Sequence, residues 1–115
     1  MKLAIIGSRG IALDIAEIKA YVPSDVDVII SGGANGVDTS AALYARKMNI
    51  KLIEIKPDYK RYGKAAPLIR NREIVKTADK VIIFWDGKSK GSKFVIDECE
   101  KTDKEYELFC VKRTK

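Results

Sequence analysis

The stretch Leu3-Ala4-Ile5-Ile6-Gly7-Ser8-Arg9-Gly10 decides the fold, because an apolar run leads directly into a glycine-bearing loop. The same order recurs twice. Apolar residues 28–30 precede the loop 31–36, and apolar residues 81–85 precede the loop 86–92. A plausible helix follows each loop. Strands that alternate with helices predict a parallel sheet, in which such loops gather at the carboxyl ends of the strands.

The whole chain continues this alternation. We predict strands at residues 2–6, 26–30, 51–55, 80–85 and 106–111. We predict helices at residues 12–21 and 37–48, a third that starts near Pro67, and a fourth that starts after Gly91 with Ser92 as its N-cap. With right-handed crossovers, these elements predict an α/β fold with a doubly wound, five-stranded parallel sheet in the order 3-2-1-4-5 and helices on both faces. We expect one domain, residues 1–115.

Composition narrows the possible partners. The chain has 22 Lys and Arg against 16 Asp and Glu, a net charge of +6, which favours an anionic partner. It has no histidine, and Cys99 and Cys110 lack a CxxC spacing, so we expect no metal site, and nothing in the sequence calls for a cofactor. We expect both cysteines to be small buried residues. No apolar run reaches the roughly 20 residues that span a bilayer, so we expect a cytoplasmic protein without membrane contact.

The first two loops carry the chemistry of phosphate binding. Glycine lets a backbone approach a ligand closely, and a helix N-terminus presents free N–H groups to anions. Arg9 can pair bidentately with a phosphate, and Ser8 can donate its hydroxyl to the same oxygen. The small residues at 31–36 indicate a ligand close to the backbone. Asp38 either interacts with the dipole of its helix or contacts a ribose hydroxyl.

The roles of the later segments, around residues 70–71 and 86–92, are less clearly defined by the sequence. Arg70 and Asn71 open a helix after the connection 56–66, which has a length that is often functional, but their position suits a crevice and a solvated helix turn equally. The loop 86–92 combines glycine, hydroxyls and cations, yet it lacks the GxxxxGK[ST] spacing, so we infer no ATP hydrolysis. Trp85 and Tyr62 are candidates to stack on a base, and Trp85 suits the core as well.

The predicted ligand-binding residues all come from these segments. They are Gly7, Ser8, Arg9, Gly32, Gly33, Ala34, Gly36, Asp38, Arg70, Asn71, Asp86, Ser89, Lys90, Gly91 and Ser92. We assign no catalytic residue.

Three motifs in combination resemble the SLOG superfamily, which groups the DNA-processing protein A family with the Lonely Guy phosphoribohydrolases. They are Ser31-Gly32-Gly33-Ala34-Asn35-Gly36-Val37-Asp38, Arg70-Asn71-Arg72-Glu73-Ile74, and the Ser/Gly loop before the last helix. The pattern is most similar to small stand-alone SLOG proteins related to YspA and YpsA. The resemblance implies a Rossmann-like fold that binds a nucleotide or a related phosphorylated ligand, and it favours a functional role for Arg70 and Asn71.

The same resemblance argues against one reaction. In the phosphoribohydrolase branch, the last loop reads Gly-Gly-x-Gly-Thr-x-x-Glu, and the glutamate serves catalysis. Aligning Gly91 and Ser92 with its Gly-Thr pair places Val95 at the glutamate position. Cleavage of an N-glycosidic bond needs a positioned carboxylate or an equivalent group. Asp97 and Glu98 lie two and three residues later, in other directions from the helix axis.

Three functions therefore stay open at this point. We favour a module that binds or senses a nucleotide-derived ligand and expect it to form a homodimer or a higher oligomer. A small enzyme that acts on a nucleotide or phosphoribosyl compound would need Asp38, Glu73 or Asp86 in the crevice. A binder of single-stranded nucleic acid would resemble the DNA-processing branch, and we expect such binding to be weak and electrostatic.

Overall fold

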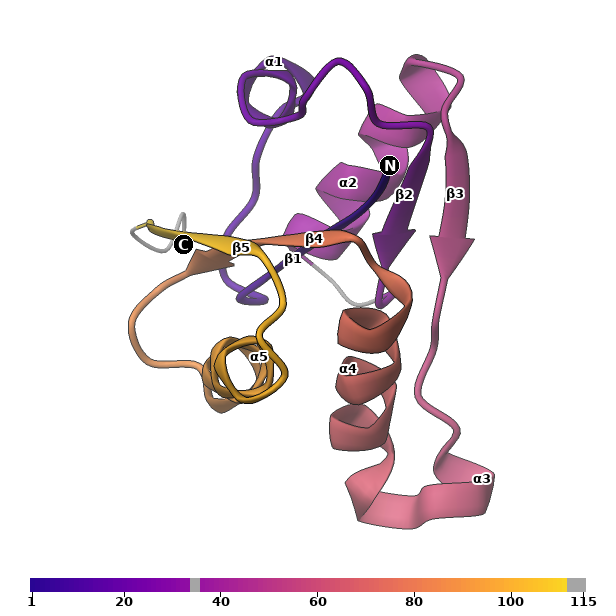
Figure 1. Ribbon diagram of the computed structural model, residues 1–115, viewed down its shortest axis with the longest axis vertical. Coiled ribbons are helices and arrows are strands. Elements are labelled where there is room, and N and C mark those ends of the chain that lie inside the picture. The colour runs from indigo at the N-terminus through magenta and orange to yellow at the C-terminus, as the bar shows by residue number, and fades with distance from the viewer. Residues whose placement is uncertain (34–35, 112–115) are drawn as a thin grey trace.

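The strands form one parallel sheet, as the sequence predicts. In the computed structural model, which describes residues 1–33 and 36–111, the strands are β1 (Lys2–Gly7), β2 (Val28–Ser31), β3 (Lys51–Glu54), β4 (Lys80–Trp85) and β5 (Tyr106–Cys110). All neighbours pair in parallel, in the order β3-β2-β1-β4-β5 (Figure 1). The chain reverses its direction of winding between β1 and β4. The carboxyl ends of these two strands therefore flank the switch point of a Rossmann-like sheet, where such folds bind ligands.

Helices cover both faces of this sheet. They are α1 (Ile15–Lys19), α2 (Val37–Lys47), α3 (Tyr59–Tyr62), the 3-10 turn η1 (Gly63–Ala65), α4 (Ala66–Thr77) and α5 (Lys90–Lys101). Side chains alternate across each strand. On β1, Leu3 and Ile5 pack in the hydrophobic cluster that includes α1 and α2, whereas Ala4 and Ile6 pack with α4 and α5. The core therefore has two layers, one on each face (Figure 1).

Helix capping explains why α1 is shorter than predicted. The predicted helix spans residues 12–21, but α1 begins at Ile15. The Asp14 carboxylate accepts a hydrogen bond from the Glu17 N–H at 2.8 Å, and the Glu17 carboxylate accepts one from the Asp14 N–H at 3.0 Å. This capping box satisfies two free donors and sets the first turn. Periodicity alone placed the start three residues too early.

Two further helix predictions are corrected. The last helix begins at Lys90 with Ser89 as its N-cap, so Ser92 lies inside the first turn and is not the cap. The connection 56–66 is not an open loop, because it contains α3 and η1. Asp58 starts α3 by accepting a hydrogen bond from the Arg61 N–H at 3.2 Å. The helix is one turn long, too short for a hydrophobic period to reveal it.

The strand ends and the cysteines also differ from prediction. β2 begins at Val28 rather than residue 26, and β5 ends at Cys110 rather than residue 111. Cys99 is buried in α5, as expected, but Cys110 is exposed. The reason is that β5 is an edge strand, so one of its sides has no neighbouring strand in the described sheet to cover it.

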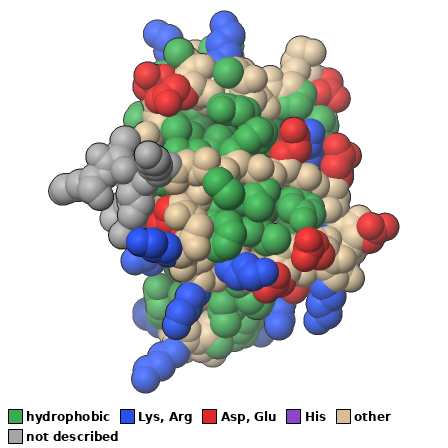
Figure 2. All heavy atoms as spheres, turned by 90° about the vertical axis from the view of Figure 1, so that its left-hand side faces the viewer, with side chains coloured by type: hydrophobic (Ala, Val, Ile, Leu, Met, Phe, Trp, Pro, Cys, Tyr) green, Lys and Arg blue, Asp and Glu red, His purple; other side chains and the backbone are tan. Residues whose placement is uncertain are grey.

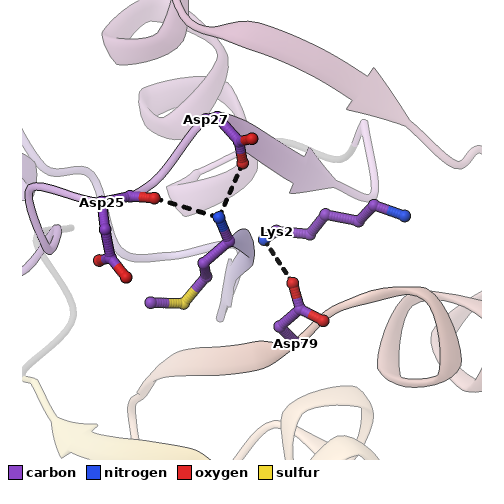
Figure 3. A network of polar contacts seen from close by, with 5 residues as sticks. Lys2, Asp25, Asp27 and Asp79 are labelled. Carbon is purple, nitrogen blue, oxygen red and sulfur yellow. Dashed lines mark hydrogen bonds and ion pairs between the residues drawn. The ribbon is translucent and has the colours of Figure 1, made fainter.

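A polar network ties the start of β1 to the segments before β2 and β4. The amino group of Met1 donates to the Asp27 carboxylate at 2.8 Å and to the Asp25 carbonyl at 3.1 Å (Figure 3). The Lys2 N–H donates to the Asp79 carboxylate at 2.7 Å. The hydrogen bond with Asp27 raises the pKa of the amino group and lowers the pKa of Asp27. These contacts lie at the amino ends of the strands, opposite the switch point.

None of the helices described is long and apolar enough to cross a membrane.

Candidate functional site

The carboxyl ends of β1 and β4 border an open pocket of about 300 Å³, here called the crevice. The loop after β1, the start of α2, one face of α4 and the first turn of α5 all contribute to it. The lining residues are Ile6, Gly7, Ser8, Arg9, Asp38, Pro67, Leu68, Arg70, Asn71, Ile74, Ser89, Gly91, Ser92 and Val95. The site lies where the topology of the sheet predicts a ligand.

Two hydrogen bonds hold the side chain of Arg70. Its Nη1 donates to the carbonyl oxygen of Gly32 at 2.6 Å, and its Nε donates to Oδ1 of Asn71 at 2.7 Å. Asn71 is itself buried. A guanidinium has five N–H donors, so these bonds fix the plane of the group without using all of its donors. Arg70 is thereby oriented at the crevice before any ligand arrives.

Arg9 brings a second positive charge to the same crevice. Burial lowers the pKa of Arg70, the charge of Asp38 opposes this change, and the charge of Arg9 adds to it. A guanidinium nevertheless keeps its proton at physiological pH. The two arginines and the carboxylate of Asp38 therefore lie at the same crevice.

Gly32 has a structural reason to be glycine. A Cβ atom at this position would lie 2.7 Å from Nη1 of Arg70 and 2.9 Å from Oδ2 of Asp38. Asp38 is buried, with 6% of its surface exposed. The missing side chain lets the arginine and the carboxylate approach the backbone of the β2 loop. The close approach inferred from the glycines thus involves side chains of the protein itself.

Ser8 joins the first and third loops. Its Oγ accepts a hydrogen bond from the Asp86 N–H at 3.1 Å and lies 2.9 Å from Oγ of Ser89. One oxygen of Asp86 accepts bonds from the N–H groups of Lys88 and Ser89, both at 2.8 Å. Asp86 therefore shapes the third loop and does not line the crevice. Ser8 and Ser89 present adjacent hydroxyls there instead.

Most of the predicted ligand-binding residues meet at the crevice. Those that line it are Gly7, Ser8, Arg9, Asp38, Arg70, Asn71, Ser89, Gly91 and Ser92. Gly32 adjoins it through its bond to Arg70. The residues that do not line it are Gly33, Gly36, Asp86 and Lys90. Ala34 lies outside the described residues.

Sequence reasoning missed the apolar wall of the crevice. It consists of Ile6, Pro67, Leu68, Ile74 and Val95. Helical spacing could have predicted this wall. Residues 67, 70, 71 and 74 share one face of α4, and residues 92 and 95 share one face of α5. Val95, which the resemblance aligns with the glutamate of the phosphoribohydrolases, is one of these lining residues.

The two aromatic candidates for base stacking lie outside the crevice. Tyr62 lines a neighbouring pocket of about 320 Å³, which shares Arg70 with the crevice. Trp85 donates its indole N–H to the Ser89 carbonyl at 3.0 Å. It lines a shallow hollow of about 430 Å³ with Phe94 and three lysines, Lys88, Lys90 and Lys93. Neither ring therefore lines the crevice.

With this geometry established, comparison with protein families identifies the chain. The model of the YspA, cpYpsA-related SLOG family matches residues 2–62, more than half of the sequence. The chain belongs to this SLOG family. The match covers the first two glycine loops, and Arg70 and the third loop lie beyond it. A comparison with curated proteins gives no match.

A solved structure shares the fold of this SLOG chain. It is DNA processing protein A (DprA) from Streptococcus pneumoniae, with a TM-score of 0.75 and 20% sequence identity. The alignment covers 93% of this chain and 49% of that one, so the chain spans about half the length of the DprA chain. At this identity, the likeness establishes the Rossmann-like fold alone.

Proposed function

We propose that the crevice binds the phosphate of a nucleotide or nucleotide-derived ligand, and that the chain serves as a ligand-binding or sensing module. One observation carries this proposal. Arg9 and Arg70 line the same crevice. A phosphate between them would accept charge-assisted hydrogen bonds from both, with Arg70 already oriented by Gly32 and Asn71.

The start of α5 supplies further donors for an anion. Ser8, Ser89 and Ser92 place three hydroxyls along the crevice wall. α5 is twelve residues long, and its N-cap Ser89 forms no side-chain capping bond within the described structure. First-turn N–H groups without a side-chain acceptor suit a phosphate oxygen, and the helix dipole favours negative charge at that end.

Family membership and fold support a ligand of this class. The resemblance to SLOG proteins implies nucleotide-like ligands, and the structural relative is named for DNA processing. The charge of +6 also fits an anionic partner. We infer that the ligand contains phosphate and a nucleoside-like group, without identifying the base.

Catalysis has less support than binding. Among the described residues that line the crevice, Asp38 supplies the only carboxylate. Glu73 lines the neighbouring pocket, and Asp86 shapes the third loop. An enzyme acting on a phosphoribosyl compound would therefore depend on Asp38 as its acid or base, with the apolar side chain of Val95 nearby.

Binding of single-stranded nucleic acid is a second candidate, favoured by one specific observation. The hollow that contains Trp85 and Phe94 borders the crevice at Leu68 and carries Lys88, Lys90 and Lys93 on its wall. Aromatic rings beside positive charges suit stacked bases and their backbone. Lys93 also pairs with Asp97 at 2.8 Å, which reduces its attraction for a phosphate.

Isothermal titration calorimetry tests the proposed function. The ligands would be the four 5′-ribonucleoside monophosphates and ribose 5-phosphate. We expect Arg9→Ala and Arg70→Ala to lose about 1–3 kcal/mol of affinity each, the scale of a hydrogen bond to a charged group. Arg46→Ala removes an arginine from the last turn of α2 and should bind as the parent does. Unchanged affinity in both crevice variants, for a ligand that the parent binds, would refute the assignment.

A further inference from the structure

The pocket that Tyr62 lines, here called the β3 pocket, lies beside the crevice. Its volume is about 320 Å³, and it is bordered by the segment after β3, by α3 and by α4. Figure 1 shows that segment running beside α4 toward α3. Arg70 lines both the crevice and the β3 pocket. A ligand held at Arg70 can therefore extend from one into the other.

The glycines after β2 lie against residues of the β3 pocket. The Gly32 carbonyl accepts its hydrogen bond from Arg70, and a Cβ atom on Gly33 would lie 3.2 Å from Cγ of Lys56. Arg70 and Lys56 both line the β3 pocket. Gly33 does not line the crevice, so the glycine loop serves the β3 pocket as well as the crevice.

One wall of the β3 pocket is apolar and includes an aromatic ring. It consists of Ile55, Tyr62, Ala66 and Ile69. Tyr62 is 38% exposed, and the guanidinium of Arg61 lies 5.5 Å from the centroid of its ring. Arg61 does not line the pocket, so this contact does not fill it. Among the described residues, no aromatic ring lines the crevice.

Charged groups of both signs complete the lining of the β3 pocket. They are Lys56, Asp58, Arg70, Arg72, Glu73 and Lys76. Within the described part of the chain, Lys56, Glu73 and Lys76 form no ion pair. The Asp58 carboxylate accepts one backbone hydrogen bond, from Arg61, and a carboxylate has room for more. Donors and acceptors are therefore both available to a ligand.

A nucleobase has the chemistry that this lining fits. Every base has a flat face that stacks on an aromatic ring, and its edge carries hydrogen-bond donors and acceptors together. An inorganic anion would make no use of the apolar wall. A wholly apolar ligand would leave the buried ends of the charged groups without partners.

Positive charge is concentrated at the end of the molecule that carries the β3 pocket. Figure 2 views the side of β5 and shows Lys and Arg side chains gathered in the lower part of the molecule, the end at which α3 lies in Figure 1. Four cations line the β3 pocket against two carboxylates. This excess attracts a ligand that is itself an anion, as a nucleotide is.

We propose that the β3 pocket holds the base of a nucleotide, stacked on Tyr62, while Arg9 and Arg70 hold its phosphate in the crevice. The assignment rests on the proposed function and adds the place of the nucleoside half. Arg70 lies where the two halves of the ligand meet. A sugar phosphate without a base would occupy the crevice alone.

Calorimetry with ligands that differ only in the base tests this assignment. We expect the parent to bind at least one 5′-ribonucleoside monophosphate more tightly than ribose 5-phosphate. Tyr62→Ala should weaken binding of that nucleotide roughly tenfold, within the range for a lost stacked base, and leave binding of ribose 5-phosphate unchanged. Tyr59→Ala removes a tyrosine of the same helix that is 57% exposed and does not line the pocket, and it should bind as the parent does. Circular dichroism would establish that both variants fold.

The two ligands separate failure of the base pocket from failure of the proposed function. If Tyr62→Ala binds every nucleotide as the parent does, or if the parent binds ribose 5-phosphate as tightly as the nucleotides, the base pocket is wrong. The phosphate site still stands in either case when Arg9→Ala weakens binding of ribose 5-phosphate. A parent that binds none of these ligands would refute the phosphate site and the base pocket together.

NMR of the complex locates the base directly. We expect nuclear Overhauser effects between protons of the base and the ring protons of Tyr62. Effects confined to the methyl groups of Leu68 and Val95 would place the base against the apolar wall of the crevice and would overturn the proposal.

Discussion

Nη1 of Arg70 donates a hydrogen bond to the carbonyl oxygen of Gly32 at 2.6 Å, across 38 positions of sequence. This bond joins the first half of α4 to the loop after β2. It explains why a glycine and an arginine far apart in the chain act together. A side chain at position 32 would occupy the space of the guanidinium. Both residues therefore determine where positive charge lies in the crevice.

Substitution of two glycines should separate binding from folding. Gly32→Ala should displace the flexible end of Arg70, since the new Cβ lies 2.7 Å from Nη1. We expect roughly tenfold weaker nucleotide binding, within the range for a lost hydrogen bond to a charged group, and a small change in the free energy of unfolding. Calorimetry and urea denaturation would measure the two effects.

Gly36→Ala is the matched comparison. Its Cβ would lie 2.6 Å from the Arg9 carbonyl oxygen, and φ at this residue is +77°. Rigid backbone and a left-handed conformation both oppose a side chain, so we expect a loss of roughly 1–3 kcal/mol in the free energy of unfolding. If Gly32→Ala lowers stability as much as Gly36→Ala and leaves affinity unchanged, Gly32 serves folding alone.

We predict that the chain does not release free adenine from AMP. Val95 lines the crevice at the position expected for a catalytic glutamate, and Asp38 is the one carboxylate among the described lining residues. Chromatography of AMP incubated with the protein should show no more adenine than a buffer control. Rapid release that Arg70→Ala abolishes would contradict this prediction and favour the enzyme hypothesis.

We predict that binding to single-stranded DNA is weak and depends steeply on salt. The lysines near Trp85 would contact few phosphates, and each contact releases counterions. Fluorescence anisotropy should show affinity falling between about 50 and 200 mM salt, and Lys88→Ala should reduce the salt slope. Tight binding at physiological salt that increases with strand length would favour the nucleic-acid function instead.

Cys99 should resist thiol reagents while the chain is folded. Burial raises the pKa of its thiol to about 11, and the thiolate is the reactive form. The folded state favours the protonated thiol, so this contribution to stability is complete below the ordinary pKa near 9 and is lost as the pH rises through 11. In Cys110→Ser, a chromogenic disulfide at pH 8 should react with Cys99 only after denaturant is added. Rapid reaction without denaturant would show that Cys99 is accessible.

Local pattern was sufficient to predict the architecture. Apolar runs such as residues 81–85 and the helices between them determined the number and order of the elements, and the handedness of crossovers then selected the strand order. The same reasoning placed the three glycine loops at one edge of the sheet. Ser8 and Arg9 follow β1 directly in the sequence, and both line the crevice.

The directions of several side chains were decided only by the tertiary structure. Asp86 and Lys90 both come from the segment 86–92, but neither lines the crevice. Asp86 accepts a hydrogen bond within its own loop, and Lys90 lines the hollow that contains Trp85. The position of Arg70 in the sequence suited a crevice and a solvated helix turn equally. Its side chain is held in place by a hydrogen bond to the carbonyl oxygen of Gly32, in the loop after β2. Cys110 is exposed because β5 lies at the edge of the sheet. A sequence pattern reflects interactions between residues that are close along the chain. These outcomes depend instead on contacts between residues that only folding brings together.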